Sequence, residues 1–152
     1  MSAKFGISQA ALGDLPDVAR LFDHYRVFYG KDSDEAGAEA FLFTLMEHRE
    51  SVILLARAEA DRQAIGFAQL YPAYSSISMQ RSWILNDLFV LEDWRNQGVA
   101  RQLLKAAAEM ARLTEAKGIA LETALDNLSA QKLYESMGYV RDTRFYHYYL
   151  TL

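Results

Sequence analysis

Trp83-Ile84-Leu85-Asn86-Asp87-Leu88-Phe89-Val90 is the stretch of this 152-residue sequence from which the rest of the expected fold can be worked out. Its β-branched and aromatic residues predict a buried strand, because the run is short for a buried helix. An acidic connector leads to Arg95-Asn96-Gln97-Gly98-Val99-Ala100, and apolar residues then recur at positions 99, 103, 107 and 110. That spacing places them on one face of a helix. The stretch therefore predicts a strand, a basic turn and a helix.

The turn before this helix has the features of an anion site. Gly98 and Ala100 are small, so a ligand can approach the backbone closely. The first turn of a helix has N–H groups without intrahelical partners and a partial positive charge, and Arg95 and Arg101 add full charges. These features favour a diphosphate. An ordinary strand-to-helix turn with surface arginines is the alternative, because a short turn with one glycine is a weak motif.

Two motifs of the chain resemble those of a known enzyme family. Residues 95–100 are similar to the acetyl-CoA signature Gln/Arg-x-x-Gly-x-Gly/Ala of the GCN5-related N-acetyltransferases, with Ala100 in place of the commoner second Gly. Residues 127–139 resemble the second motif, in which an Asn opens a helix, a Tyr lies on it and a Gly–aromatic pair closes it. The resemblance spans essentially the whole chain. It implies acetyl-CoA as the cofactor and an amine as the acetyl acceptor.

The order of elements predicts an α/β fold in a single domain, residues 1–152. Helices are expected from Asp14 to about Tyr25, from near Ser33, from Val99 to a stop at Lys117-Gly118, and from Asn127. The crossover over residues 83–124 predicts two parallel neighbours in a mixed sheet. The resemblance implies about six to seven strands, helices on both faces, and a central parallel pair that splays apart. The expected strands are residues 5–7, 51–58, 64–71 (ended by Pro72), 83–90, 119–124, 139–141 and 145–150.

The resemblance also assigns the cofactor site. The pantetheine arm is expected against the backbone of the first parallel strand, and the diphosphate at the turn and the start of the helix. The second-motif helix is expected to complete the site. The expected cofactor-binding residues are Leu88, Phe89, Val90, Arg95, Asn96, Gln97, Gly98, Val99, Ala100, Arg101, Asn127, Ala130 and Tyr134.

Acetyl transfer to an amine needs a proton acceptor and a proton donor. A free alkylamine has a pKa of about 10 and must be neutral to attack, and a departing thiolate, whose thiol has a pKa of roughly 8.5, gains from a nearby donor. The resemblance makes Tyr134 the donor; a core aromatic beside Leu133 and Met137 is the alternative. Asp87 is the candidate base, because an acidic residue in an apolar strand is costly unless it is paired or functional. Pairing with a basic side chain, or a chain of water as the base, is the alternative.

The same strand departs from a related pattern. It is similar to the polyamine and thialysine acetyltransferases, which have a Glu-Asp pair where this chain has Asn86 and Asp87. That Glu is the residue usually credited with deprotonation through water. The overall likeness is to bacterial proteins related to the yeast histone acetyltransferase group, which does not establish a histone as substrate.

The acceptor is expected to be a primary amine of a small molecule or a peptide. Aromatic faces and carboxylates both attract ammonium groups, so Asp87 or the acidic residues at 32, 34 and 35 are expected to draw it in. Packing of a helical hairpin and capping of a helix are the alternatives for these residues. The side chains expected to line the site are Tyr25, Tyr29, Tyr74 and Asn86.

Composition narrows the class of protein. The formal net charge of −4 argues against nucleic-acid binding. The chain has no cysteine, and its three histidines lack metal-ligand spacing, so no metal is expected. No apolar run has membrane-spanning length and no signal-peptide pattern is present, which predicts a cytoplasmic protein without a membrane partner. An aromatic C-terminal strand is suited to extend the sheet across a two-fold axis, so a homodimer is expected. A non-catalytic acyl-CoA-binding sensor or assembly module is the alternative function; Tyr134 favours an enzyme.

Overall fold

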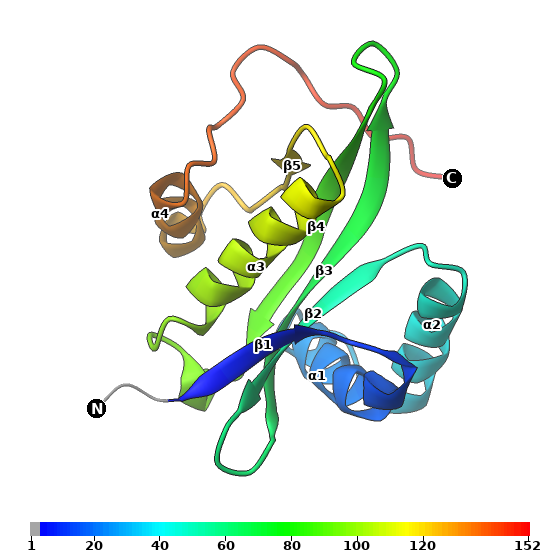
Figure 1. Ribbon diagram of the computed structural model, residues 1–152, viewed down its shortest axis with the longest axis vertical. Helices are drawn as coiled ribbons and strands as arrows, with labels where there is room; N and C mark the ends of the chain where they lie inside the picture. Colours follow the sequence, from blue (N-terminus) through cyan, green and yellow to red (C-terminus); the bar gives the residue numbers. More distant parts are fainter. Residues whose placement is uncertain (1–3) are drawn as a thin grey trace. The chain divides into compact units, whose positions relative to one another are not determined.

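The computed structural model describes residues 4–152, which divide into two compact units. The first unit ends at Glu122 and contains the whole sheet with helices α1, α2 and α3 (Figure 1). The second unit, Thr123–Leu152, contains helix α4. The two units are described separately below.

The described residues of the first unit form a five-stranded sheet in the order of the sequence. Strands β1 to β4 are antiparallel to one another, and β5 is parallel to β4, with Trp83 opposite Ile119. Helix α3 (Val99–Leu113) makes the crossover between β4 and β5. The predicted mixed α/β sheet with a parallel pair is therefore confirmed. The strands are β1 (Phe5–Gln9), β2 (Val52–Ala58), β3 (Ala64–Ser75), β4 (Gln80–Val90) and β5 (Ile119–Ala120).

The strand count is lower than predicted, because the C-terminal residues form no strand in the described part of the chain. The strands expected at 139–141 and 145–150 are wrong for this structure. The aromatic side chains of residues 145–150 are exposed instead, Tyr146 by 90% and Tyr148 by 92%. An isolated two-stranded hairpin is at best marginally stable without a third strand or a helix to cover it. Strand β5 is also shorter than the expected 119–124.

Strand β3 corrects a second prediction, since it continues through Pro72 instead of ending there. The pairing of β2 with β3 ends at Val52 and Leu70, so β3 has no neighbour on that side beyond Leu70. A proline is tolerated where no ladder partner needs its missing N–H group. Strands β3 and β4 therefore run on as a long hairpin, in which Ser75 pairs with Gln80.

Helix α1 (Leu15–Phe28) has Pro16 in its first turn, as predicted, but runs three residues beyond the expected break at Tyr25. It ends where Gly30 takes φ +86°, and the N–H groups of Gly30 and Lys31 donate to the carbonyls of Val27 (2.9 Å) and Arg26 (3.0 Å). This is the Schellman arrangement, which satisfies the last carbonyls of a helix.

Helix α2 (Glu35–Glu47) begins at Asp34, whose side chain accepts the N–H of Gly37 at 2.9 Å. The buried carboxylate of Asp23, in α1, accepts the Ser33 hydroxyl at 2.6 Å and the Asp34 N–H at 2.7 Å. These two bonds hold the pKa of Asp23 below its ordinary value. Asp23 therefore ties the first helix to the start of the second.

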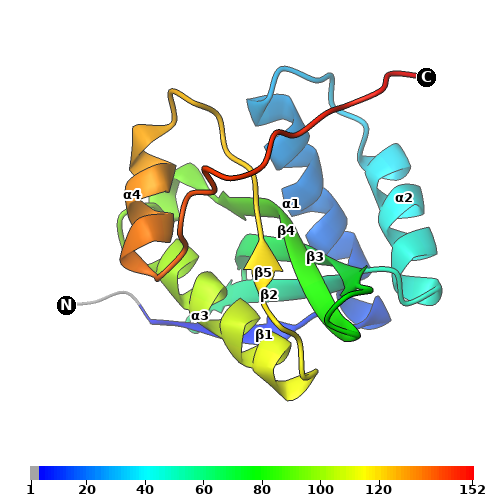
Figure 2. The ribbon, with the colours of Figure 1, turned by 90° about the horizontal axis from the view of Figure 1, so that it is seen from above.

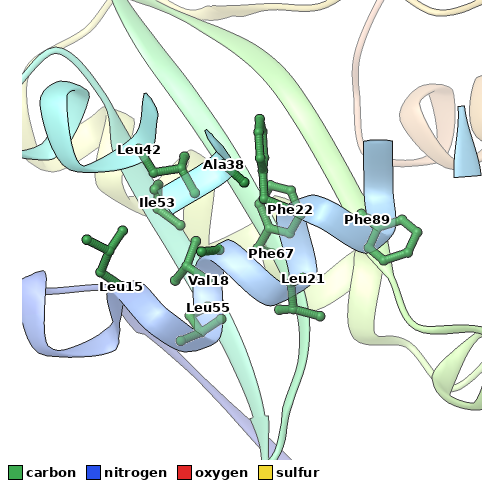
Figure 3. Close-up of a cluster of buried hydrophobic side chains, with 11 residues drawn as sticks. Leu15, Val18, Leu21, Phe22, Ala38, Leu42, Ile53, Leu55, Phe67 and Phe89 are labelled. Carbon is green, nitrogen blue, oxygen red and sulfur yellow. The ribbon is translucent and has the colours of Figure 1, made fainter. Parts of the chain in front are cut away.

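Helices cover both faces of the sheet, as predicted (Figure 2). Helices α1 and α2 bury apolar side chains against β2, β3 and β4; Phe22, Leu42, Leu55 and Phe67 belong to this cluster (Figure 3). Helix α3 packs on the opposite face through Val99, Leu103, Leu104, Ala107 and Ala111. It ends at Leu113, four residues before the predicted stop. Full burial of each large side chain contributes about 1.5–3 kcal/mol.

Candidate active site

The turn between β4 and α3 follows the short helix η2 (Glu92–Trp94) and ends in Gly98, the N-cap of α3. Gly98 has φ +85° and Asn96 has φ +61°, so two residues of this turn are left-handed. No side chain of the described residues caps the helix, and its first intrahelical bond runs from the Gln102 N–H to the Gly98 carbonyl at 3.0 Å. Helix-start N–H groups such as those of Val99 and Ala100 have no intrahelical acceptor. A side-chain carbon added at Gly98 would meet nothing within 4 Å, so a ligand can reach this backbone.

Two side chains of the turn are used internally. The Gln97 amide Nε2 donates to the Asp93 carbonyl at 2.9 Å, which closes the loop. Arg95 Nε donates to the Val90 carbonyl at 3.0 Å, at the end of β4. The contribution of Gln97 to an anion site is therefore its backbone N–H rather than its side chain.

Strand β4 carries a bulge at Asn86. Gln69 lies opposite Asp87 while Leu70 lies opposite Leu85, so Asn86 is the extra residue of β4. Bulges bend a strand and increase its local twist. The pairing of β4 with β5 covers only Trp83 and Ile84. Leu88, Phe89 and Val90, the residues expected to meet the pantetheine arm, lie beyond that pairing, which ends where β5 ends at Ala120.

Asp87 is buried, with 6% of its surface exposed, and its partners are amides. Gln69 Nε2 donates to Asp87 Oδ2 at 2.8 Å, and Asn86 Nδ2 lies 3.2 Å from both carboxylate oxygens. Within residues 4–152, no Lys, Arg or His forms an ion pair with it, so the alternative of pairing with a basic side chain is wrong. Buried charges are normally paired with an opposite charge. This carboxylate therefore lacks the counter-charge that its burial calls for.

Gln69 is a candidate site residue that the sequence pattern did not predict. It is fully buried, and its Nε2 also contacts the Tyr71 hydroxyl at 3.1 Å, while its carbonyl oxygen accepts no hydrogen bond from the described residues. Burial, and secondarily the charge of Asp87, raise the pKa of Tyr71 to about 12. The Tyr71 phenol therefore stays protonated at ordinary pH and is no base. The available signal was a polar residue in the apolar run of β3, facing a polar residue in the apolar run of β4.

The aromatic side chains of α1 pack on the same face of the sheet as Asp87. The ring of Tyr25 lies 5.7 Å from Phe67 and 5.8 Å from Phe89, and Tyr29 lies 5.0 Å from Tyr25. Phe89 is two residues from Asp87, so both side chains point to one face. The structure therefore brings Tyr25 and Tyr29 to the side of the sheet that holds Asp87.

Tyr74 lies elsewhere. It is seven residues beyond Phe67 in β3, about 23 Å at the usual rise of a strand, and its odd spacing places it on the opposite face. Its ring packs against the guanidinium of Arg81 at 5.3 Å. The structure does not bring Tyr74 together with Tyr25 and Tyr29. The expected acidic cluster caps α2 through Asp34, as its alternative had it.

The second unit has the local geometry that its motif predicts. Helix α4 (Leu128–Ser136) begins at Asn127, whose side-chain oxygen accepts the Ala130 N–H at 3.2 Å. It closes at Gly138, where φ is +96°, and the Tyr139 N–H donates to the Tyr134 carbonyl at 3.1 Å. Tyr134 is half-buried, and its ring centre lies 5.8 Å from that of Tyr139. The Asn that opens the helix and the Gly–aromatic pair that closes it are therefore confirmed.

Residues 4–152 contain no group of three or more His, Cys, Asp or Glu side chains placed to hold a metal ion. None of the helices described here is long and apolar enough to cross a membrane.

Comparison with known proteins identifies the class of this fold and site. The model of the Acetyltransferase (GNAT) family matches residues 18–139. N-acetyltransferase YhfO of Bacillus subtilis is 48% identical over 146 residues, which cover 96% of this chain and 97% of that protein. A crystal structure of a probable acetyltransferase superposes with a TM-score of 0.92 at 45% identity, over 97% of both chains. The chain belongs to the GNAT family of acetyltransferases.

The family membership defines the cofactor and the general reaction. An aminoglycoside N-acetyltransferase solved in complex with CoA shares the fold, with a TM-score of 0.79 at 22% identity over 100% of this chain and 98% of that one. The protein is an N-acetyltransferase that uses acetyl-CoA and acts on an amine acceptor. The N-terminus of α3 fits the diphosphate of this cofactor, because no side chain of the described residues caps the helix and the space beside Gly98 is open.

Proposed function

We propose that the protein transfers an acetyl group from acetyl-CoA to a primary amine of a small molecule or a peptide, by direct attack of the amine. The observation that carries the proposal is the buried carboxylate of Asp87, which has only amide partners and lies on the aromatic face of the sheet. A primary ammonium group supplies both the missing positive charge and three N–H donors. The unpartnered carbonyl oxygen of Gln69 adds a second acceptor beside Asp87.

The proposed cofactor site uses the backbone more than side chains. The N–H groups of Gln97, Gly98, Val99 and Ala100 hold the diphosphate, and the backbone of residues 88–90 faces the pantetheine arm. Asn96 and Arg101 lie at the same turn and helix start and complete the proposed set in the first unit. The second motif contributes Asn127, Ala130 and Tyr134. The left-handed Gly98, and the absence of a β5 partner for β4 beyond Ile84 among the described residues, support this assignment.

The proposed proton transfers use Asp87 of β4 and Tyr134 of the second motif. When bound, acetyl-CoA supplies a thioester, whose carbon–sulfur bond breaks as the amine nitrogen bonds to the carbonyl carbon. Asp87 draws in the ammonium group and takes its proton, directly or through water, so that the amine attacks in its neutral form. Tyr134 gives its phenolic proton to the sulfur of the leaving thiolate. The role of Tyr134 rests on the second motif rather than on a distance.

The test is a turnover screen of the purified protein with acetyl-CoA against amines, amino acids and peptides. Release of free thiol should require a primary amine, and the same compounds already acetylated on nitrogen serve as matched controls. Tight binding of acetyl-CoA without amine-dependent thiol release would favour the non-catalytic binding module instead.

The proposal extends to the working state of the protein. The whole chain, residues 1–152, acts as one catalytic domain in a cytoplasmic homodimer. The exposed aromatic side chains of the C-terminal segment support an association through that segment, since Phe145, Tyr146 and Tyr149 are all largely exposed. Light scattering should give twice the monomer mass, and a monomer at micromolar concentration would contradict the dimer.

A further inference from the structure

We infer that Arg95, the first residue of the cofactor turn, is a positioning residue that fixes the aromatic wall of the acceptor site, rather than a ligand of the phosphates. The inference rests on the proposed function for the location of the acceptor. It reassigns a residue whose motif alone would place it among the cofactor ligands.

The contacts of Arg95 are directed toward the end of β4 and helix α1. Its Nε donates to the Val90 carbonyl at 3.0 Å. Its guanidinium carbon lies 5.1 Å from the ring centre of Phe28 and 5.7 Å from that of Phe89. Those two rings are 6.2 Å apart, so one guanidinium contacts both. Arginine is suited to this arrangement because its planar group stacks on rings while its N–H groups donate in the plane.

Phe28 is the residue that this contact holds in place. It is the last residue of α1 and is 61% exposed, so the helix itself gives its ring little packing. Its ring lies 5.3 Å from that of Tyr29, which in turn lies 5.0 Å from that of Tyr25. A continuous row of ring contacts therefore leads from Arg95 to the aromatic residues on the acceptor side. Arg95 therefore fixes the positions of Phe28, Tyr29 and Tyr25, the aromatic residues against which the acceptor is proposed to bind.

Arg95→Lys and Arg95→Gln separate the two roles. A phosphate ligand would keep its charge in the Lys variant and lose it in the Gln variant, so affinity for CoA would fall only in the second, by about tenfold or more. A positioning residue loses the planar stack in both variants. Both should then raise the acceptor KM by about three- to tenfold, the scale of a cation–π contact. The turnover number should change less, and calorimetry should give a CoA Kd within about threefold of wild type.

A double-mutant cycle with Phe28→Leu tests the contact itself. If Arg95 acts through Phe28, the Arg95→Lys and Phe28→Leu effects on the acceptor KM should not add, because either change breaks the same contact. Arg81→Lys is the matched control, since Arg81 also lies over two rings, Tyr74 at 5.3 Å and Trp83 at 5.2 Å. That control should leave the acceptor KM unchanged.

Amide hydrogen exchange supplies a readout that needs no turnover. Arg95→Lys loses the stacking of the guanidinium on Phe28 and Phe89, so amide exchange in residues 25–30 should become faster. Amide exchange in α3 should stay at the wild-type rate. The inference is overturned if residues 25–30 exchange as in wild type, if the two KM effects add, or if CoA affinity falls in the Gln variant alone. A wild-type protein that acetylates no amine would refute the proposed function, and the exchange and CoA measurements would still decide the role of Arg95.

Discussion

The proposed cofactor turn, residues 95–100, and the proposed acceptor face, formed by Asp87, Gln69, Tyr25 and Tyr29, differ in how they are built. The turn at residues 95–100 is closed by contacts between near neighbours, such as Gln97 with Asp93 and Gln102 with Gly98. The acceptor face joins residues that are far apart: Gln69 and Asp87 are eighteen residues apart, and Tyr25 reaches β3 and β4 from the first helix. The contiguous half of the site is the half that the family motif describes. The assembled half is where we propose that the acceptor binds, so mutations in one half should leave the function of the other half intact.

The largest effect is expected from Tyr134, which belongs to neither half. Tyr134→Phe should lower turnover by about 10²-fold or more, the scale of general acid catalysis, while CoA affinity stays near wild type because the ring is kept. Tyr139→Phe is the matched control, since its buried hydroxyl has no hydrogen-bond partner in the described chain. Loss of an unpartnered hydroxyl should be neutral or stabilising. Steady-state kinetics with normal turnover in Tyr134→Phe would exclude its role as the acid.

The next largest effect should fall on the cofactor turn alone. Gly98 has φ +85°, so most substitutions there would add backbone strain to any loss of binding. Asn and Asp both tolerate this conformation and have the same shape, so the pair isolates the charge. Gly98→Asp should bind CoA at least about tenfold more weakly than Gly98→Asn in calorimetry. Equal CoA affinity of the two variants would show that the diphosphate does not lie at this turn.

The same contrast explains what could be predicted from the sequence. The strand, turn and helix of residues 83–110 were predicted correctly, because periodicity and the turn residues act over short distances. The bulge at Asn86 was not predicted, because it depends on how β4 pairs with β3. Gln69 was not predicted for the same reason, because its role depends on Asp87, the residue opposite it in β4.

Local signals also misled at particular positions. Pro72 was expected to end β3, but it lies where β2 no longer pairs with that strand. The alternating aromatic residues at 145–150 predicted a strand, but a strand needs a neighbour that the sequence pattern does not supply. Tyr74 was grouped with Tyr25 by residue type, whereas the strand spacing separates them.

Lowering the pH should weaken the link between α1 and α2 that Asp23 makes. The Ser33 hydroxyl and the Asp34 N–H lower the pKa of Asp23 below its ordinary value of 3.8. A carboxyl whose folded pKa is depressed stabilises the protein fully above the unfolded pKa, and this stabilisation is lost as the pH falls through the folded pKa. The urea concentration at the unfolding midpoint should therefore decrease as the pH is lowered below about 4. This decrease should be less steep in Asp23→Asn than in the wild type. The same dependence of the urea midpoint on pH in the wild type and in Asp23→Asn would show that the hydrogen bonds of Asp23 do not hold α1 to α2.

The smallest effect is expected at Tyr74. Because it lies on Arg81, away from Tyr25 and Tyr29, Tyr74→Ala should change acceptor KM and CoA affinity by less than about twofold, the usual size of a surface substitution. Tyr29→Ala is the comparison variant, and it should raise the acceptor KM without changing CoA affinity. A larger effect at Tyr74 than at Tyr29 would move the acceptor site to the hairpin of β3 and β4.

The acceptor kinetics of Asp87→Asn, taken together with its CoA affinity, decide whether the buried carboxylate serves the reaction or only the fold. The variant keeps the shape of the side chain and removes the buried negative charge that the ammonium group is proposed to meet. Glu39→Gln, an exposed residue of α2, is the control for the loss of one charge. We expect kcat/KM for the amine to fall by about 10²-fold in Asp87→Asn, while the CoA Kd from calorimetry is unchanged. A folded Asp87→Asn variant with wild-type kinetics and only a lower unfolding midpoint would contradict this expectation, because Asp87 would then be a structural residue.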